Sequence, residues 1–510
     1  MAKRKKQTSS DFFLGSRNLN FVLVGSLLFL SNINGTQLVG ENESVYTNNM
    51  TVMAWGMTSV LAMMIVSEFF MPIYLKSGIT TTPEYLEQRF DKATQQIVSL
   101  IFLVSYLVNM LPSVLYSGAV VFKGLFDWSG YLGLNDWYVL IGIIWFLGIS
   151  ATIYALVGGV RILALSDTLL GLSLLIGGIS LPYFGIKALG NGNLQDGFTV
   201  LLGSHREHFN AIGTSTDAIP FSTIFTGMLL INLNYWGIEQ YIVQRTLSAR
   251  NLAESQKGLA LAAVGKLLSP LMLNLPGIIA VHLYPNIANS AEVFPKLAGD
   301  VLPSICIFFI AFAILGAAIT GFNAGLTSSS TLFVMNIYKP YFSKKYKAAL
   351  SDHQQIKVAK YFQVIVAILA MCIAPFIYYV KGGFYNYLQM VGSVFSVPIF
   401  TIIFVGFITK WTPALAAKIG LIFFVSSYAI LQFFCNTGIH YLHLLGILFV
   451  VTTAIMLLIG KMYPRETPFI LIDKHQIDIH PWKNRYAYYA ILLLLMVFIY
   501  ILFSPLGLAK

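Results

Sequence analysis

The stretch from Phe21 to Asn42 begins as an apolar helix and changes character partway along its length. From Ser31 to Gln37 it reads SNINGTQ, so amides, hydroxyls and a glycine interrupt an otherwise oily segment. At about 1.5 Å per residue, Asn32 would lie roughly 18 Å along the segment, near the middle of a ~30 Å hydrocarbon layer. Polar groups and a glycine at that depth cost free energy unless they line a cavity.

A second interruption of the same kind occurs at residues 231–237, which read INLNYWG. Again an Asn-x-Asn pair and a glycine break an apolar segment. Two interrupted helices at corresponding places in two halves of a chain are typical of the central binding site of a transporter. The alternative is that these polar residues only hold buried helices together.

Composition indicates an all-α, polytopic membrane protein, because 57% of the 510 residues are hydrophobic and only 10% are charged. We expect a single membrane domain over residues 1–510 with about thirteen transmembrane helices. Their approximate ranges are 19–40, 51–75, 95–122, 132–157, 160–188, 219–245, 257–283, 300–335, 357–380, 383–408, 413–435, 438–460 and 485–507.

The net charge of +11 is unevenly distributed and fixes the expected orientation. The loop at 41–50 contains Glu41 and Glu43 but no Lys or Arg. An excess of Lys and Arg marks cytoplasmic loops. We therefore expect a multi-pass protein of the cell inner (plasma) membrane, with a cytoplasmic N terminus, an external C terminus and no nucleic-acid partner. The basic residues that lie in alternate loops are Lys76, Arg89, Lys92, Arg245, Arg250, Lys257, Lys339, Lys344, Lys345, Lys347, Lys461, Arg465, Lys474, Lys483 and Arg485.

A few charged residues fall inside the expected helices, where each suggests a function. Lys266 lies deep in its helix and indicates a polar cavity, since snorkelling to the interface is difficult from there. Asp167 is either functional or interfacial. We expect Glu239 to pair with a nearby Arg or Lys, and Glu68 to be structural.

No constellation of residues indicates an enzyme, because the sequence has neither a nucleotide-binding loop nor a metal cluster at catalytic spacing. The loop expected at 189–218 contains His205 and His208, a pair that could hold a metal on a helix. Without a third ligand apparent nearby, we expect this loop to be solvated. The polar residues gather at the helix interruptions instead, which favours a transporter over a membrane enzyme or a channel.

Several motifs in this order resemble the bacterial sodium/solute symporter family, which contains the sodium/glucose and sodium/galactose cotransporters. The resemblance covers roughly residues 11–508. The motifs that carry it are Asn234–Gly237, Gln240–Leu247, Gln256–Gly258, Thr82–Phe90, Gly158-Gly159 before Asp167, and Asn336–Lys339.

This resemblance implies two inverted five-helix repeats with interrupted first helices, at about 19–188 and 219–408. Additional C-terminal helices would follow at 413–507. Family members usually carry a further helix before the first interrupted one, whereas only residues 1–18 precede it here.

The resemblance also implies a sugar-binding site, and one departure from it. Tyr235 matches the aromatic that closes the inner exit, with Trp236 beside it, and Trp55 and Tyr385 match an outer gate. The family's sugar-binding glutamate on the second helix is Gly56 here, so the solute differs from galactose or another group replaces the carboxylate. The remaining binding positions are Asn32, Gln37, Ser59, Asn232, Lys266 and Gln389.

A sodium ion is the implied cofactor. Its ligands would be the carbonyls of Leu30, Ile33 and Ala317 and the hydroxyl of Thr320, with Asp167 behind them. A second hydroxyl position of the family is Gly321 here. Two hypotheses therefore stay open: sodium-coupled uptake of a sugar or sugar-like solute, or a proton-coupled or uncoupled transporter of another small organic solute with a degraded sodium site.

Overall fold

The computed structural model describes residues 17–509 except 34, 127, 158–159, 288, 347–349, 380–383, 436 and 476. The described residues form helices and connecting loops, with only two isolated β-bridges among them. The elements in chain order are α2 (Phe21–Asn32), α3 (Gly35–Thr47), η2 (Met50–Val52), α4 (Met53–Ile65), η3 (Val66–Phe70), α5 (Met71–Ser77), α6 (Thr82–Arg89), α7 (Lys92–Ser105), η4 (Tyr106–Met110), α8 (Leu111–Leu125), α9 (Trp128–Leu132), α10 (Asp136–Val157), α11 (Val160–Leu189), α12 (Leu194–Gly203), η5 (Arg206–Phe209), η6 (Phe221–Phe225), α13 (Gly227–Gly237), α14 (Gln240–Thr246), α15 (Leu252–Leu267), η7 (Pro270–Asn274), α16 (Leu275–Leu283), η8 (Ser290–Glu292), α17 (Val293–Val301), α18 (Ser304–Leu332), η9 (Phe333–Tyr338), α19 (Lys339–Tyr346), α20 (Asp352–Ile373), η10 (Ala374–Tyr379), α21 (Phe384–Ile408), α22 (Ala414–Phe433), α23 (Tyr441–Met462) and α24 (Arg485–Leu502).

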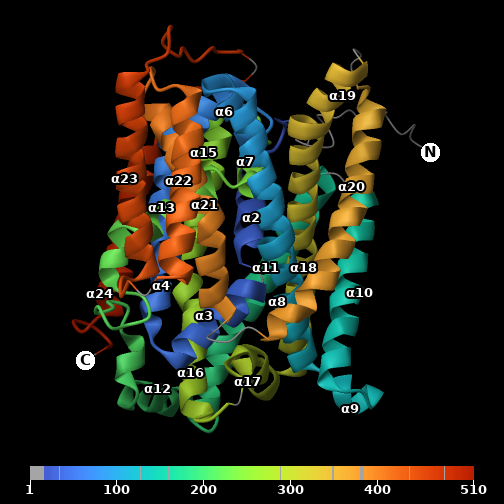
Figure 1. Ribbon diagram of the computed structural model, residues 1–510. Helices are drawn as coiled ribbons and strands as arrows, with labels where there is room; N and C mark the ends of the chain where they lie inside the picture. The colour runs from blue at the N-terminus through green and yellow to red at the C-terminus, as the bar shows by residue number, and fades with distance from the viewer. Residues whose placement is uncertain are drawn as a thin grey trace.

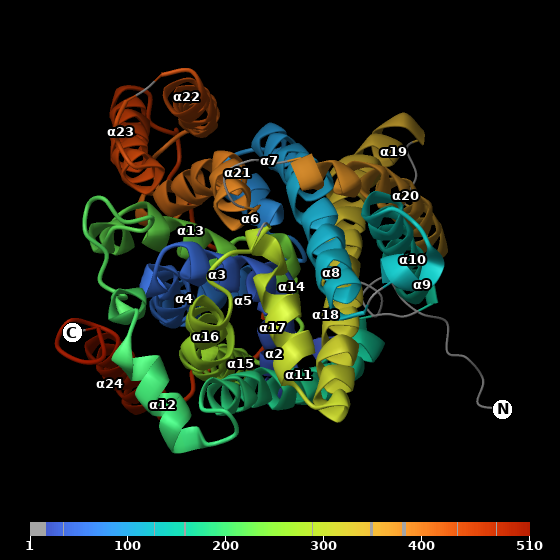
Figure 2. The ribbon, with the colours of Figure 1, turned by 90° about the horizontal axis from the view of Figure 1, so that it is seen from below.

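The long helices stand side by side in one bundle, and the short helices α9, α12 and α17 lie at its lower end (Figure 1). Seen from below, α3 and α16 lie near the middle, with α22 and α23 at one edge and α10 and α20 at another (Figure 2). The first half of the interrupted segment, α2, packs along α15 and also contacts α11 and α18. The first half of the interrupted segment therefore lies inside the bundle.

In the described part of the chain, 10 helical spans are long and apolar enough to cross a membrane, or up to 11 if the bent pair of α11 and α12 is one span. The two interrupted spans do not pass this test because the structure divides each into short helices. Together with α11, they account for the difference from the thirteen expected helices. The chain is a nearly all-helical, multi-pass membrane protein.

Four of the long spans contain a π-helical segment, and each segment ends two residues before a proline. The segments are η3, η4, η7 and η9, and the prolines are Pro72, Pro112, Pro276 and Pro340. A proline inside a helix lacks an N–H and clashes with the carbonyl four residues earlier. A wider turn accommodates that clash without ending the span. The prolines thus explain where these helices depart from α geometry.

Both interruptions expected from the sequence are present. The helix α2 ends at Asn32, and the N–H of Ile33 donates to the carbonyl of Phe29 at 2.9 Å. The helix α13 ends at Gly237, and the backbone turns at Ile238 and Glu239 before α14 begins. The second break therefore follows the Asn-x-Asn pair instead of containing it, so both amides project from the last turns of α13.

Glycines allow α2 and α15 to approach closely. A Cβ on Gly25 would lie 2.7 Å from the side chain of Leu261, and one on Gly258 would lie 2.6 Å from Val24. Small residues at such positions are a common means of packing helices in membranes. This packing places Phe29, in the last turns of α2, against Gly265, the residue before Lys266 on α15.

Four charged residues expected in loops are instead buried: Arg89, Arg245, Glu41 and Glu43. Arg89 lies at the end of α6 with no exposed surface, and its guanidinium donates to the carbonyls of Gly406, Thr409 and Thr412 at 2.9–3.0 Å. Glu41 was expected in an external loop, but α3 continues past it to Thr47 and buries it completely. Loop boundaries drawn from hydropathy alone end a helix too early when its last turns carry polar side chains.

Candidate functional site

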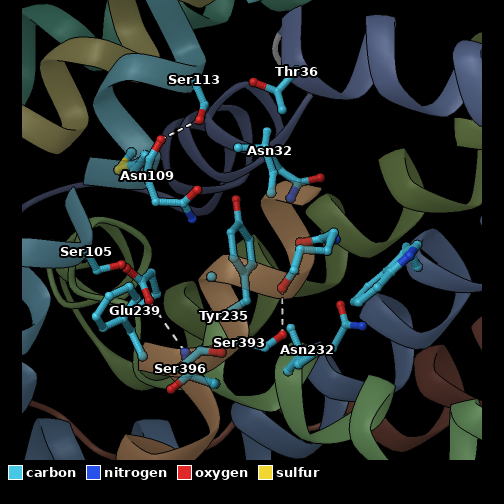
Figure 3. Close-up of a pocket in the computed structure, with 18 of the residues that line it drawn as sticks. Asn32, Thr36, Ser105, Asn109, Ser113, Asn232, Tyr235, Glu239, Ser393 and Ser396 are labelled. Atoms are coloured by element: carbon cyan, nitrogen blue, oxygen red, sulfur yellow. Dashed lines mark hydrogen bonds between the residues drawn. The ribbon is translucent and has the colours of Figure 1, made fainter. Parts of the chain in front are cut away.

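A cavity of about 210 Å³ lies where the α2–α3 break faces α13, α4, α7, α8 and α21. Its wall combines amide and hydroxyl groups with aromatic rings (Figure 3). The predicted substrate or gate residues that line it are Asn32, Trp55, Ser59, Asn232, Tyr235, Gln37, Tyr385 and Gln389. The structure thus brings together eight side chains that the sequence carries on four separate spans.

Hydrogen bonds hold several of these side chains in place. The hydroxyl of Ser59 donates to Oδ1 of Asn232 at 2.6 Å and lies 2.8 Å from the carbonyl of Trp55. Nε2 of Gln389 donates to the hydroxyl of Tyr385 at 3.3 Å. These contacts join α4 to α13 and orient polar groups toward the cavity.

Tyr235 stands among the lining residues, with its ring directed toward Asn32 (Figure 3). It lies on α13 one residue before Trp236, whose ring is fully buried and forms an edge contact with it at 5.2 Å. Trp236 does not line the cavity. Its contact with the solute stays a prediction, and its ring packs against that of Tyr235.

Lys266 is also absent from the cavity wall and lies behind it. The side chain is 1% exposed, and Nζ donates to Oε1 of Gln37 at 3.1 Å. Gln37 lines the cavity, so its side-chain amide lies between the cavity and the positive charge of Lys266. The polar environment expected around Lys266 is therefore present, although direct contact with a solute would need Gln37 to move.

A buried carboxylate that the sequence did not single out lies in the same region. Oε2 of Glu41 accepts a hydrogen bond from Nδ2 of Asn274 at 3.0 Å, while Oε1 is buried without a partner among the described residues. Glu41 and Lys266 interact electrostatically. A lone charge is costly inside a membrane, so we expect the opposite charges of these two residues to offset one another.

The carboxylate side chain that the family resemblance places at Gly56 would require the hydroxyl of Ser269 to move. A Cβ at this position would lie 2.6 Å from the hydroxyl oxygen of Ser269. That hydroxyl donates to the carbonyl of Lys266 at 2.7 Å. The departure at Gly56 therefore coincides with close packing of α4 against the turn of α15 that carries Lys266.

Several lining residues were missed by the sequence reasoning, although the sequence does contain a signal for them. Ser105, Asn109, Ser113 and Ser117 follow one another at four-residue spacing in an apolar span, and the first three line the cavity. The hydroxyl of Ser117 lies 2.9 Å from that of Thr36. Other missed lining residues, on α3 and α21, are Thr36, Ser393 and Ser396.

A second hollow of about 320 Å³ lies between the far end of α3, the segment before η6, and α23. Trp55, Tyr385 and Gln389 line both this hollow and the central cavity. Trp55 and Tyr385 are 5% and 8% exposed, and both lie between the two spaces. This is the arrangement expected of a gate, and that role remains a prediction.

The predicted sodium positions fall on three helices that pack together, α2, α11 and α18. Leu30 and Ile33 lie at the end of α2, where the last carbonyls lack helical partners. Ala317 and Thr320 are buried on α18. The side chain of Asp167, on α11, lies outside the described part of the structure.

The antiparallel packing of α11 and α18 determines which of their residues lie at the same level along the helix axes. Leu170 packs on Gly316 and Ile310 on Gly177, and the same register brings Thr320 level with the turn that holds Asp167. Asn323, on the following turn of α18, is fully buried, and neither of its amide atoms has a partner among the described residues. The sequence reasoning did not identify this amide.

The two remaining charged positions have different outcomes. Glu239 was expected to pair with Arg or Lys, but its carboxylate accepts from Nδ2 of Asn234 at 3.4 Å, and no ion pair to it occurs among the described residues. It also lines the cavity, next to the break after α13. Glu68 is structural as expected, because Nε of Arg485 on α24 lies 2.9 Å from its Oε1.

A helical membrane bundle with two interrupted spans around a polar cavity is the architecture of a secondary transporter. The chain belongs to the sodium:solute symporter family, whose sequence model matches residues 12–423. It is therefore a transporter of the sodium-coupled symporter class.

Similar proteins agree with this assignment. The chain is 38% identical over 483 residues to the uncharacterized symporter YidK of Escherichia coli, covering 94% of this chain and 84% of that one. It is 29% identical over 444 residues to the sodium/glucose cotransporter of Vibrio parahaemolyticus, covering 82% and 79%. The structure of a Na⁺-coupled sialic acid symporter shares the fold, with a TM-score of 0.76 at 20% identity and coverage of 91% and 95%.

Proposed function

We propose that this protein takes up a sugar or sugar-like solute together with sodium by alternating access. The cavity wall carries the proposal: amides and hydroxyls from Asn32, Gln37, Ser59 and Asn232 surround the ring of Tyr235. A sugar presents hydroxyl donors and acceptors and an apolar face, and this lining offers partners for both. The similarity to a sodium/glucose cotransporter supports the same class of solute.

In this proposal Glu41 takes the part of the carboxylate that is absent at Gly56. It lies one helical turn after Gln37 on α3 and interacts with Lys266, which bonds to Gln37. Its free oxygen can accept a hydrogen bond from the solute if Gln37 and Lys266 shift on binding. The carboxylate then approaches the solute from the α3 side instead of the α4 side, so the solute would differ from galactose in the hydroxyls recognised.

The proposed transport cycle uses two inverted repeats, at about 19–188 and 219–408. The π segments support this division, since they occur in the second and third spans of both halves: η3 and η4 in one, η7 and η9 in the other. Trp55 and Tyr385 would separate the cavity from outside, and Tyr235 would close the inner exit. We place the end with α6 and α19 in the cytoplasm and the end with α9, α12 and α17 outside, in the plasma membrane.

Sodium would bind at the carbonyls of Leu30, Ile33 and Ala317 and the hydroxyl of Thr320, with Asp167 as electrostatic support. Oxygen ligands suit a hard cation. The missing hydroxyl at Gly321 favours weak sodium binding. The same observation supports the alternative of a proton-coupled or uncoupled transporter.

The deciding experiment is uptake into proteoliposomes that contain the purified protein, over a panel of labelled monosaccharides and polyols. Each solute is tested with an inward sodium gradient, with a proton gradient and with neither. Sodium-dependent uptake of one sugar supports the proposal. Uptake that is equal under all three conditions, or that follows protons alone, supports the alternative. A Gln37→Ala variant, which removes the amide between the cavity and Lys266, serves as the binding-defective control.

A further inference from the structure

A cluster of imidazole and carboxylate groups lies at the lower end of the bundle, apart from the transport cavity. His205, Glu207 and His208 offer ligand atoms that all lie within 4.8 Å of one another. Nδ1 of His205 is 3.5 Å from Oε1 of Glu207. The expectation that this loop has no third ligand is therefore wrong. Glu207 belongs to the short helix η5, one residue before His208.

A fourth candidate ligand comes from a distant part of the sequence. The ring of His282, near the end of α16, lies 5.0 Å from the ring of His205. Its Nδ1 is 3.0 Å from the carbonyl of Ile278, and its Nε2 is buried without a partner among the described residues. A neutral imidazole that donates from Nδ1 keeps its lone pair on Nε2.

His208 is oriented in the same way. Its Nδ1 lies 3.0 Å from the carbonyl of Val45, in the last turns of α3. Histidines that ligate metals usually donate their other ring N–H to a carbonyl or carboxylate, which fixes the ring and its tautomer. Two of the three histidines therefore already have the outer contact typical of a metal ligand.

We infer that His205, Glu207 and His208, with His282 beside them, form a binding site for a divalent transition-metal ion of the zinc type. Imidazole nitrogens with one carboxylate oxygen suit Zn²⁺ and its neighbours. Ca²⁺ and Mg²⁺ prefer sites built of oxygen and are disfavoured here.

The location gives such an ion a mechanical effect. The segment that carries η5 connects α12 to η6, while His282 belongs to α16 and His208 bonds to α3. The helices α3 and α16 pack closely, since a Cβ on Gly277 would lie 2.8 Å from Val45. A bound ion would fasten the connecting segment to these helices and restrain α3, the second half of the first interrupted span.

The test is metal binding by the full-length purified protein in detergent, after removal of any histidine tag. Co²⁺ serves as the probe, because its visible absorption reports nitrogen and oxygen ligands, and Zn²⁺ is then titrated by calorimetry. His205→Asn removes one imidazole while keeping a residue that tolerates the left-handed backbone found there, where φ is 53°. Glu207→Gln removes the carboxylate charge.

The matched control is His480→Asn, which breaks a lone exposed His–Asp pair whose Nδ1–Oδ1 distance is 2.5 Å. We expect one ion per chain in the parent and in the control, and at least about tenfold weaker binding in the two ligand variants, as for losses around other metal sites. Absence of binding in the parent, or equal binding in all four proteins, would overturn the inference. The assay does not involve transport, so its outcome is independent of the proposed function.

Discussion

Nζ of Lys266 donates a hydrogen bond to Oε1 of Gln37 across the interface between α15 and α3, at 3.1 Å. Gln37 faces the cavity, whereas Lys266 is buried behind it. The amide therefore connects a buried charge to the site where we propose that the solute binds.

Replacing Gln37 by alanine should weaken solute binding strongly and leave folding intact. The change removes an amide from the cavity wall and leaves Lys266 with one fewer acceptor. Unpaired polar groups in such an environment cost about 1–3 kcal/mol, so affinity should fall about tenfold or more. Binding is measured by calorimetry and folding by thermal unfolding in detergent. A variant that transports at the parental rate would place the binding site elsewhere.

Glu41 and Lys266 should behave as a compensating pair. Lys266→Met alone leaves a buried carboxylate uncompensated, which typically destabilises a protein by about 3–5 kcal/mol. The double variant Glu41→Gln with Lys266→Met should recover most of the lost thermal stability, but not solute binding. Melting temperatures of the parent, both single variants and the double variant give the interaction energy. Additive changes across the four proteins would show that the two residues act independently.

The proposed orientation is tested with single cysteines on a background in which Cys306, Cys372 and Cys435 are replaced. Asn48 and Ser343 are both exposed and lie near opposite ends of the bundle. In intact cells, a cysteine at Asn48 should react with an impermeant thiol reagent, and one at Ser343 should react only after the membrane is opened. The reverse pattern would invert the topology.

Gly321→Ser should lower the sodium concentration needed for half-maximal uptake. The substitution restores a hydroxyl beside Thr320, and one recovered ligand contributes about 1 kcal/mol, or roughly fivefold in apparent affinity. Thr320→Ala is the matched change in the opposite direction and should raise that concentration. If uptake by the parent needs no sodium and neither change introduces a dependence, the ion-coupled proposal fails.

Asp91 should stabilise the start of α7 in a pH-dependent way. It caps the helix by accepting from the N–H of Thr94 at 2.8 Å and pairs with Lys418 at 2.5 Å. Partial burial raises the pKa of this carboxyl, but the bonds from Lys418 and Thr94 outweigh it and hold the pKa below its usual value. The stabilisation is thus complete above the ordinary pKa of aspartate and is lost as the pH falls through the depressed one.

Two substitutions separate the contributions of Asp91. Asp91→Asn keeps the cap and loses the ion pair, so it should cost less than about 1 kcal/mol. Asp91→Ala loses both, with the cap alone contributing about 1 kcal/mol. Thermal unfolding at neutral and acid pH checks this order. Equal melting temperatures for the two variants would show that the cap contributes nothing.

The sequence predicted the helical membrane fold from local signals, and the family resemblance added eight of the 24 residues that line the cavity. Hydropathy marks the spans, and Asn32 and Asn232 stand out in apolar surroundings. The position of Glu41 could not be predicted in the same way, since its burial depends on Asn274 and Lys266 from a different span. His282 likewise joins His205 only through the packing of α16. Tertiary contacts of this kind produce no periodic pattern in the amino-acid sequence.

The π segment η4 has a consequence for how its span is aligned in rotation. In an α-helix, residues four apart drift by roughly 40° around the axis, so three such steps from Ser105 to Ser117 would turn the row by about 120°. A π turn accommodates one additional residue, which returns about 100° of that rotation. The row of side chains therefore keeps one direction around the helix axis. Ser105 at one end faces the cavity, and Ser117 at the other end faces Thr36. A helical wheel drawn without the π turn would assign the two ends of this row to different faces, and Pro112 is the residue that keeps them in phase.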